Sequence, residues 1–213
     1  MVEAYIFDFD GVIADTENRR FLKIQELLWQ KGIKVADEYK PRTNGRTTRD
    51  ILFEDFTGQL SLATIDQILA QYQVEFKSHV HEFAEPISPT IEFLRGYQGH
   101  AKLGLASMSP RESVTQILHK FGLEKRFDQI CTREAVNKNK PNPEIYLLAA
   151  EKLRVKPTTC VAIEDTPVGA SAAIAAGMRC YILMNGHNDK QGFSDIATSG
   201  FIESLSDFAA TGI

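Results

Sequence analysis

Two carboxylates with the spacing of a catalytic or metal-binding pair occur near the start of the chain, in the run Asp8-Phe9-Asp10-Gly11-Val12. In an extended chain, residues two apart point to the same side, so Asp8 and Asp10 can face one cleft. Gly11 allows a tight turn and a close approach of backbone amides to an anion. Val12 and Ile13 exclude an EF-hand loop, which needs an oxygen ligand and a glycine at those positions. A single pair of this kind identifies no function.

A candidate anion-binding segment is Leu105-Ala106-Ser107-Met108-Ser109-Pro110. The hydroxyl of Ser107 and backbone amides such as that of Met108 would lie at a helix N-terminus, where anions bind. Ser109 is expected to cap that helix, with Glu112 completing a capping box. Lys140 precedes another helix start, and is either a fixed charge for a phosphate or a solvated lysine.

Two adjacent acids, Glu164 and Asp165, follow the apolar run of residues 160–163. Two carboxylates at the end of a buried strand cost desolvation and repulsion unless a cation or hydrogen-bond donors compensate them. A helix starting at Thr166-Pro167 explains one of these acids through its N-terminal charge, and explains two less well.

The candidate catalytic and binding residues share one location in the expected fold. All fall just past expected strands or at adjoining helix starts: Asp8, Asp10, Ser107, Lys140, Glu164 and Asp165. Open parallel sheets bind their ligands at that edge. Four carboxylates there require a hard cation, and oxygen ligands without a nearby His or Cys favour Mg²⁺ over zinc. The lysine, the serine and the amides would hold an anionic group against the metal, and phosphate is the expected group.

Short apolar strands, each followed by a helix, must position these residues. The expected strands are residues 5–7, 103–106, 160–163 and 180–184, with 129–132 as a weaker fifth. They are too short for buried helices and apolar enough to be covered on both faces. Proline follows a capping residue at Ser88, Ser109, Asn142 and Thr166, and Gly177 fits a helix stop. The pattern predicts an α/β fold with a parallel sheet and helices on both faces.

One long stretch breaks this alternation. From residue 15 to about residue 83 no good strand occurs, and the apolar residues follow helical spacing. The two stripes are Phe21, Ile24, Leu27 and Leu28, and Leu62, Ile65, Leu69, Tyr72 and Phe76. We therefore expect a core domain of residues 1–14 and 86–213, with a helical cap domain of residues 15–85 inserted after the first strand.

The overall composition excludes some classes of function. The formal net charge of −4 argues against a general nucleic-acid-binding protein, which needs a basic surface. The three cysteines are odd in number and widely spaced, which favours buried reduced thiols over disulfides. No basic leader and no apolar run near the ~20 residues of a membrane span occurs. The sequence thus predicts a cytoplasmic protein with no membrane or protein partner.

Taken together, these motifs resemble those of the haloacid dehalogenase-like (HAD) phosphatases, most closely the branch of β-phosphoglucomutase and phosphoglycolate phosphatase. The matching residues cover nearly the whole chain: Asp8-Phe9-Asp10-Gly11-Val12 with Asp15-Thr16-Glu17, Ser107, Lys140-Pro141-x-Pro143, and Glu164-Asp165-Thr166-x-x-Gly169 with Ala175-Ala176-Gly177. The resemblance implies a Rossmann-like core, a mobile cap and an aspartyl-phosphate intermediate.

The resemblance also implies a role for each motif residue. Asp8 would be the nucleophile and a Mg²⁺ ligand, and Asp10 the general acid and base, with its carbonyl on the metal. Asp165 would bind the metal, and Glu164 would bind it directly or through water. The expected phosphate-binding set is Gly11, Ser107, Met108 and Lys140.

Hydrolysis of a small phosphorylated metabolite is favoured over three alternatives. Dehalogenases proper lack the second aspartate and need no metal. A sugar-phosphate mutase would carry a histidine where this chain reads Asn18-Arg19-Arg20, although Lys77 matches a cap lysine of β-phosphoglucomutase. A non-enzymatic binding protein would normally have lost the nucleophile or the acid. Four cap residues are candidates for contacting an anionic substrate when a lid closes: Arg20, Arg46, Arg49 and Lys77.

Overall fold

The computed structural model describes residues 1–43, 46–186 and 188–205, and the side chain of Lys77 lies outside the described part. The chain divides into two compact units, residues 1–15 with 85–213 and residues 16–84. The first is built on a parallel sheet and the second is helical. Within the described ranges, no helix has the length and the apolar character needed to cross a membrane.

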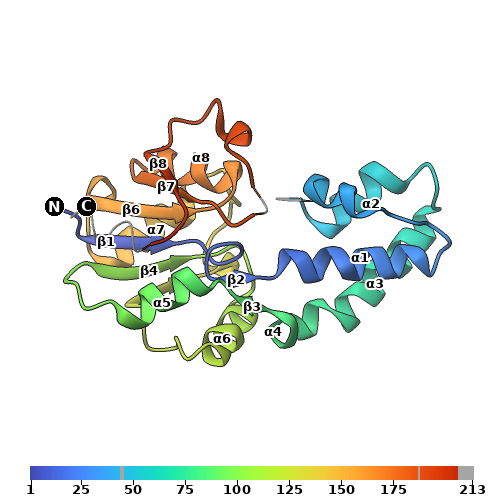
Figure 1. Ribbon diagram of the computed structural model, residues 1–213, viewed down its shortest axis with the longest axis horizontal. Coiled ribbons are helices and arrows are strands. Elements are labelled where there is room, and N and C mark those ends of the chain that lie inside the picture. The colour runs from blue at the N-terminus through green and yellow to red at the C-terminus, as the bar shows by residue number, and fades with distance from the viewer. Residues whose placement is uncertain (44–45, 187, 206–213) are drawn as a thin grey trace. The chain divides into compact units, whose positions relative to one another are not determined.

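The sheet of the first unit has the strand order β5-β4-β1-β6-β7-β8, and each neighbouring pair is parallel (Figure 1). Its strands are β1 (Ala4–Phe7), β4 (Lys102–Ala106), β5 (Gln129–Cys131), β6 (Cys160–Glu164), β7 (Arg179–Leu183) and β8 (Gly200–Ile202). The expected strands are all present, each shifted by at most one residue at either end. The sequence analysis missed β8, which is too short for an apolar pattern to identify.

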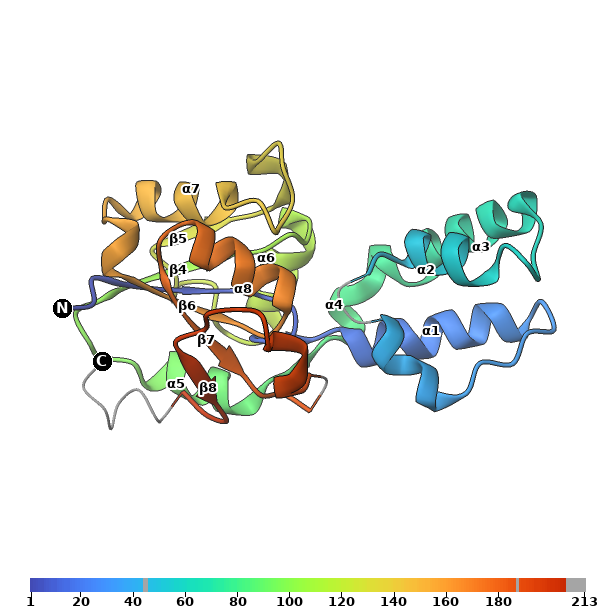
Figure 2. The same cartoon turned by 90° about the horizontal axis from the view of Figure 1, so that it is seen from above.

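Helices cover both faces of this sheet. Side chains alternate along β1, so its apolar residues point to both faces and each face must be buried. The longer helices of the unit are α5 (Ser88–Gly96), α6 (Arg111–Lys120), α7 (Glu144–Leu153) and α8 (Pro167–Ala175). Ala4 and Ile6 are buried in one cluster with residues of α7 and α8. Tyr5 and Phe7 point the other way, each with its ring centroid 6.3 Å from that of Phe93 in α5. Figure 2 shows α5 and α7 on opposite sides of the strands. The predicted α/β fold is confirmed.

A second, two-stranded sheet lies where the chain leaves and re-enters the first unit. Its strands are β2 (Ala14–Asp15) and β3 (Glu85–Pro86), and they pair antiparallel. Ala14 is opposite Pro86, and Asp15 is opposite Glu85. The outgoing and returning segments therefore run side by side.

The helical unit follows directly after β2. It contains α1 (Glu17–Trp29), η1 (Asp37–Thr43), α2 (Thr48–Phe56), α3 (Leu62–Glu75), η2 (Lys77–His79) and α4 (Val80–Phe83). It has a core of its own, in which Ile24, Leu27 and Leu28 of α1 pack against apolar residues of α2 and α3. The expected helical insertion is present, and its action as a cap stays a prediction.

Three of the four predicted helix caps are wrong, and at α7 the N-cap position is taken by Pro143 in place of Asn142. Pro110, in an extended conformation (φ −60°, ψ 142°), occupies the N-cap position of α6, and no side chain caps this helix. Ser109 and Glu112 therefore do not form the expected capping box. At α5 the helix begins one residue early, so that Ile87 is the N-cap in place of Ser88. The hydroxyl of Ser109 has a different partner, described with the site.

Helix α8 lies very close to the end of β6, because Gly169 has no side chain. A Cβ at this position would lie 1.9 Å from Oε1 of Glu164. Thr166 caps the helix as predicted, since its hydroxyl accepts a hydrogen bond from the amide of Gly169 at 3.1 Å. Gly177 has a φ of +83°, which fits the predicted left-handed stop.

We expect Gly169→Ala to lower the free energy of unfolding by about 1–3 kcal/mol, because the new methyl group overpacks the space beside Glu164. Urea denaturation followed by circular dichroism measures this change. Gly192→Ala is the matched control, because its Cβ would have no neighbour nearer than 3.8 Å. The control should change the free energy of unfolding by less than about 0.5 kcal/mol. An equal loss in both variants would contradict the packing argument.

Candidate active site

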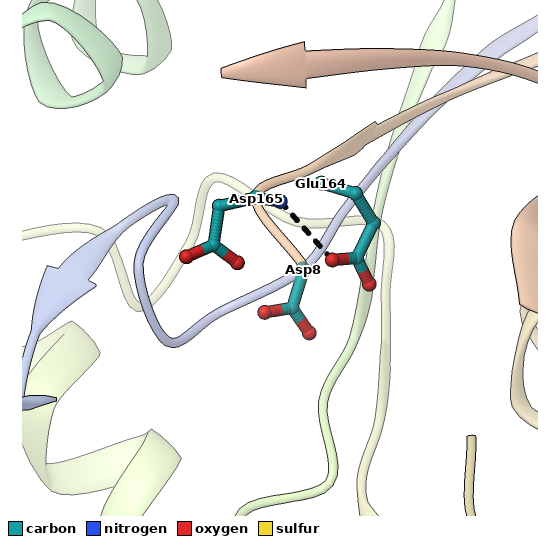
Figure 3. Close-up of side chains that lie close together, drawn as sticks. All are labelled: Asp8, Glu164 and Asp165. Carbon is teal, nitrogen blue, oxygen red and sulfur yellow. Dashed lines mark hydrogen bonds between the residues drawn. The ribbon is translucent and has the colours of Figure 1, made fainter. Parts of the chain in front are cut away.

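Three predicted site residues lie at the carboxyl ends of neighbouring strands in the middle of the sheet. Asp8 directly follows β1, Ser107 directly follows β4, and Glu164 is the last residue of β6. Because β1 lies between β4 and β6, parallel pairing brings these ends to one edge. The carboxyl groups of Asp8, Glu164 and Asp165 gather there, with one oxygen of each within 4.8 Å of the others (Figure 3).

Lys140 is buried between two of these carboxylates. Its Nζ donates to Oδ1 of Asp8 and to Oε1 of Glu164, both at 2.6 Å, and to the carbonyl oxygen of Ala106 at 3.1 Å. Its side chain is only 7% exposed. The alternative of a solvated loop lysine is therefore wrong. Burial acts to lower the pKa of Lys140, but the Asp8 and Glu164 carboxylates outweigh it and raise the pKa, so the lysine is positively charged.

Both oxygens of the buried Glu164 carboxylate accept hydrogen bonds from the protein. Besides Lys140, the hydroxyl of Tyr146 donates to Oε1 at 2.7 Å. The amides of Asp165 and Thr166 donate to Oε2 at 3.1 and 3.3 Å. These donors compensate the cost of burying the carboxylate, and they fix its position from α7 and from the segment after β6. Tyr146 was not among the predicted site residues, because a tyrosine in an apolar helix is usually a core residue.

Asp165, which follows β6, is held by two asparagines that the sequence analysis did not select, one at its carboxylate and one at its backbone carbonyl. Nδ2 of Asn185 donates to Oδ2 of Asp165 at 2.9 Å and to the carbonyl oxygen of Gly11 at 2.8 Å. Nδ2 of Asn188 donates to the carbonyl oxygens of Asp165 and Leu183. Both asparagines follow β7, the strand next to β6. The rule that selected the other site residues, polar groups just past a buried strand, applies to them as well.

Gly11 joins the loop after β1 to the loop after β6. Its φ is +80°, and a Cβ there would lie 1.9 Å from Oδ2 of Asp165. Its amide donates to the carbonyl oxygen of Ala14 at 2.9 Å, which closes the turn. The amide assigned to phosphate at this position is thus engaged within the loop.

The remaining predicted core residues lie on the loops after β1 and β4. Oδ2 of Asp10 accepts a hydrogen bond from the hydroxyl of Ser109 at 2.6 Å. Ser107 is fully buried, and its hydroxyl accepts a hydrogen bond from the amide of Ser109 at 2.9 Å. Met108 is half-buried and packs against the core cluster shared by α7 and α8. The expected contacts of Ser107 and Met108 with a phosphate stay predictions.

In the helical unit, two candidate substrate residues take part in internal hydrogen bonds. Arg20 donates to the carbonyl oxygens of Thr43 and Arg46 at 2.7 and 2.6 Å, and pairs with Glu17. Arg46 pairs with Asp55 at 2.7 Å. These contacts give both guanidinium groups a structural role within the unit, and their predicted contact with a substrate stays a prediction.

The other two candidate substrate residues of the helical unit are Arg49 and Lys77. The guanidinium of Arg49 lies over the ring of Phe53, 4.6 Å from its centroid. The side chain of Lys77 lies outside the described residues. Both remain predictions as substrate contacts.

The charge balance of the site fits a divalent cation. Burial raises the pKa of Asp8 to about 7; Lys140 opposes the rise, while the carboxylates of Glu164 and Asp10 add to it. The site thus holds more negative charge than Lys140 neutralises, and a cation would offset the excess. Its donors are carboxylate oxygens, the ligands that Mg²⁺ prefers. Since donors already fill the surroundings of Glu164, we expect Asp8 and Asp165 to be the direct carboxylate ligands.

Comparisons with known proteins agree with this geometry. A family model described as haloacid dehalogenase-like hydrolase matches residues 5–183. The YhcW protein of Bacillus subtilis is 36% identical, over 87% of this chain and 84% of the relative. The phosphorylated carbohydrates phosphatase of Thermotoga maritima is 31% identical, over 88% of each chain. The β-phosphoglucomutase of Bacillus subtilis is 29% identical, over 83% of this chain and 81% of the relative.

The family model extends over both β1 with its aspartates and β6 with its paired acids, so it includes every core motif that meets at the sheet edge. The chain therefore belongs to the haloacid dehalogenase-like hydrolase family, in the branch that includes β-phosphoglucomutase.

Proposed function

We propose that the protein is a Mg²⁺-dependent phosphatase that hydrolyses small phosphate monoesters, sugar phosphates above all, through an aspartyl-phosphate on Asp8. One observation carries the proposal: the carboxylate of Asp8 lies 2.6 Å from the buried ammonium of Lys140 and within 4.8 Å of oxygens of Glu164 and Asp165. A nucleophile placed between a fixed positive charge and a cation site suits attack on a phosphoryl group.

In the first step, a carboxylate oxygen of Asp8 attacks phosphorus, and the bond from phosphorus to the ester oxygen breaks. Asp10, in its protonated form, gives its proton to the departing alkoxide, so that an alcohol leaves. The ammonium of Lys140 stabilises the negative charge on the phosphoryl oxygens. Ser107 and the amide of Met108 would bind the same oxygens from the loop after β4.

In the second step, water attacks the phosphorus of the aspartyl-phosphate, and the bond to the Asp8 oxygen breaks. Asp10, now ionised, accepts the proton of the water, and inorganic phosphate leaves. Mg²⁺, when bound by Asp8, Asp165 and the carbonyl of Asp10, supplies further positive charge to the phosphoryl group. Splitting hydrolysis in this way replaces one difficult displacement by two easier ones.

The proposed substrate class comes from a related protein. The Thermotoga maritima relative is named for phosphorylated carbohydrates, and we propose the same class here. A mutase is the second candidate, because β-phosphoglucomutase belongs to the same branch. The residues Asn18-Arg19-Arg20, at the position of the histidine of that enzyme, favour hydrolysis.

Asp8→Asn should lower kcat/KM for a phosphate monoester by at least about a thousandfold, because an amide oxygen is a poor nucleophile and forms no acyl phosphate. Release of inorganic phosphate from p-nitrophenyl phosphate and from glucose 6-phosphate measures the loss. Asp195→Asn changes an exposed carboxylate in the same way and should leave activity unchanged. An Asp8→Asn variant that keeps near-normal turnover would reject the assignment.

Chelation with EDTA should abolish phosphate release, and added Mg²⁺ should restore it, because the candidate ligands among the described residues are carboxylates and a carbonyl, the groups that hold Mg²⁺. Asp165→Asn should raise the Mg²⁺ concentration for half-maximal activity at least tenfold, since one charged ligand becomes neutral. Titration of activity against Mg²⁺ measures both effects. Full activity in EDTA would instead favour a metal-independent route.

A panel of sugar phosphates, with β-glucose 1-phosphate and its bisphosphate activator included, distinguishes the two candidate reactions. We expect inorganic phosphate as the product from hexose phosphates, and no glucose 6-phosphate beyond the amount that hydrolysis of the bisphosphate itself releases. Enzyme-coupled detection of glucose 6-phosphate and a colorimetric phosphate assay give the two readings. Formation of glucose 6-phosphate faster than phosphate would replace the phosphatase with the mutase.

A further inference from the structure

The side chain of Ser109 makes a contact with Asp10 that has no part in capping the helix that follows it. Helix α6 starts at Arg111 behind Pro110, with no side-chain cap. The hydroxyl of Ser109 instead donates to Oδ2 of Asp10 at 2.6 Å, across 99 residues of sequence. The bond joins the loop after β4 to the loop after β1, the two segments that carry the predicted phosphate-binding and acid–base residues.

The backbone of Ser109 is held at both of its polar groups. Its amide donates to the hydroxyl oxygen of the buried Ser107 at 2.9 Å, and its carbonyl oxygen accepts from the amide of Arg133 at 3.4 Å. Ser107 in turn donates its own amide to the carbonyl of Cys131 in β5. The hydroxyl of Ser109 is therefore presented to Asp10 from a loop that is itself tied to two strands of the sheet.

We propose that Ser109 is a positioning residue for the acid–base carboxyl of Asp10; this inference rests on the proposed phosphatase function. A hydroxyl that donates to Oδ2 leaves Oδ1 as the oxygen that carries the transferable proton. In the first step that proton passes from Oδ1 to the departing alkoxide. In the second step Oδ1 takes the proton of the attacking water. Ser109 itself neither gains nor loses a proton in either step.

The position of the hydrogen bond matters because general acid–base catalysis needs correct geometry. Proton transfer by a placed side chain contributes about 10²–10⁴ in rate. A carboxyl that rotates freely about its side-chain bonds keeps only part of that factor. Loss of the Ser109 hydroxyl should therefore cost about 10–100-fold in the steps that need a proton, and little in the steps that do not.

The leaving group separates a positioning role from a structural one. An alkyl phosphate such as glucose 6-phosphate must receive a proton as its alcohol departs. p-Nitrophenyl phosphate has a phenolate leaving group that departs without one. Because kcat/KM reports the steps through phosphoryl transfer to Asp8, only the alkyl ester should respond in kcat/KM when Asp10 is poorly placed.

The experiment compares Ser109→Ala, Ser109→Thr and wild-type enzyme on both esters with saturating Mg²⁺. Ser109→Ala should lower kcat/KM about 10–100-fold for glucose 6-phosphate and less than about threefold for p-nitrophenyl phosphate. With the aryl ester, kcat and KM should fall together, because Asp10 still has to activate water in the second step. Ser109→Thr keeps a hydroxyl and should recover most of the alkyl activity.

Thr115→Ala is the matched control, because Thr115 lies on α6, the helix that follows Ser109, and its hydroxyl donates to the backbone carbonyl of Arg111 at 2.8 Å. It should leave both rates unchanged. Thermal melting of each variant shows whether the fold is retained, and the threonine variant keeps the test informative if the alanine variant unfolds.

An equal fall in kcat/KM for both esters, or no fall for either, overturns the positioning role while leaving the phosphatase in place. Wild-type enzyme that releases phosphate from neither ester, nor from the other sugar phosphates of the panel, overturns the proposed function and this inference together. A fall confined to the alkyl ester that threonine reverses supports both.

Discussion

The buried ion pair of Lys140 with Asp8 and Glu164 is the interaction on which the site depends. An ammonium removed from water is costly unless partners compensate it, and here two carboxylates lie 2.6 Å from it. The three groups come from the loop after β1, from the end of β6 and from the segment before α7, so they meet only when the sheet is complete. Glu164 is in turn fixed by Tyr146, by two amides and by the close approach of Gly169. The same framework that stabilises the charges also orients them.

The residues that bear charge or chemistry could be predicted because they obey a rule of position. Asp8, Ser107 and Glu164 each sit just past an apolar run, and parallel sheets collect such residues at one edge. Lys140 could be assigned to the site only when all the motifs were considered together, because its neighbours in sequence are equally compatible with a solvent-exposed lysine. The strands were predictable for a related reason: burial on both faces leaves a short apolar run that few other structures produce.

The residues that hold the others in place were not predictable in the same way. Ser109 was interpreted as a helix cap because a serine before proline is a common cap, and the structure gives it Asp10 as its partner. Tyr146 resembles any core aromatic residue until its hydroxyl is seen on Glu164. Arg20 and Arg46 were selected because they are positively charged. In the structure Arg20 binds backbone carbonyls and Arg46 pairs with Asp55 inside the helical unit, and sequence alone does not distinguish such a structural arginine from one that binds a substrate.

The two-residue ladder of β2 and β3 has an evolutionary implication. Since Ala14 is paired with Pro86 and Asp15 with Glu85, the inserted segment starts and finishes at adjacent points, and the sheet has no need to adjust to its length or content. We therefore expect the helical unit to tolerate changes of length and content that leave the strand ends carrying Asp8 and Glu164 where they are.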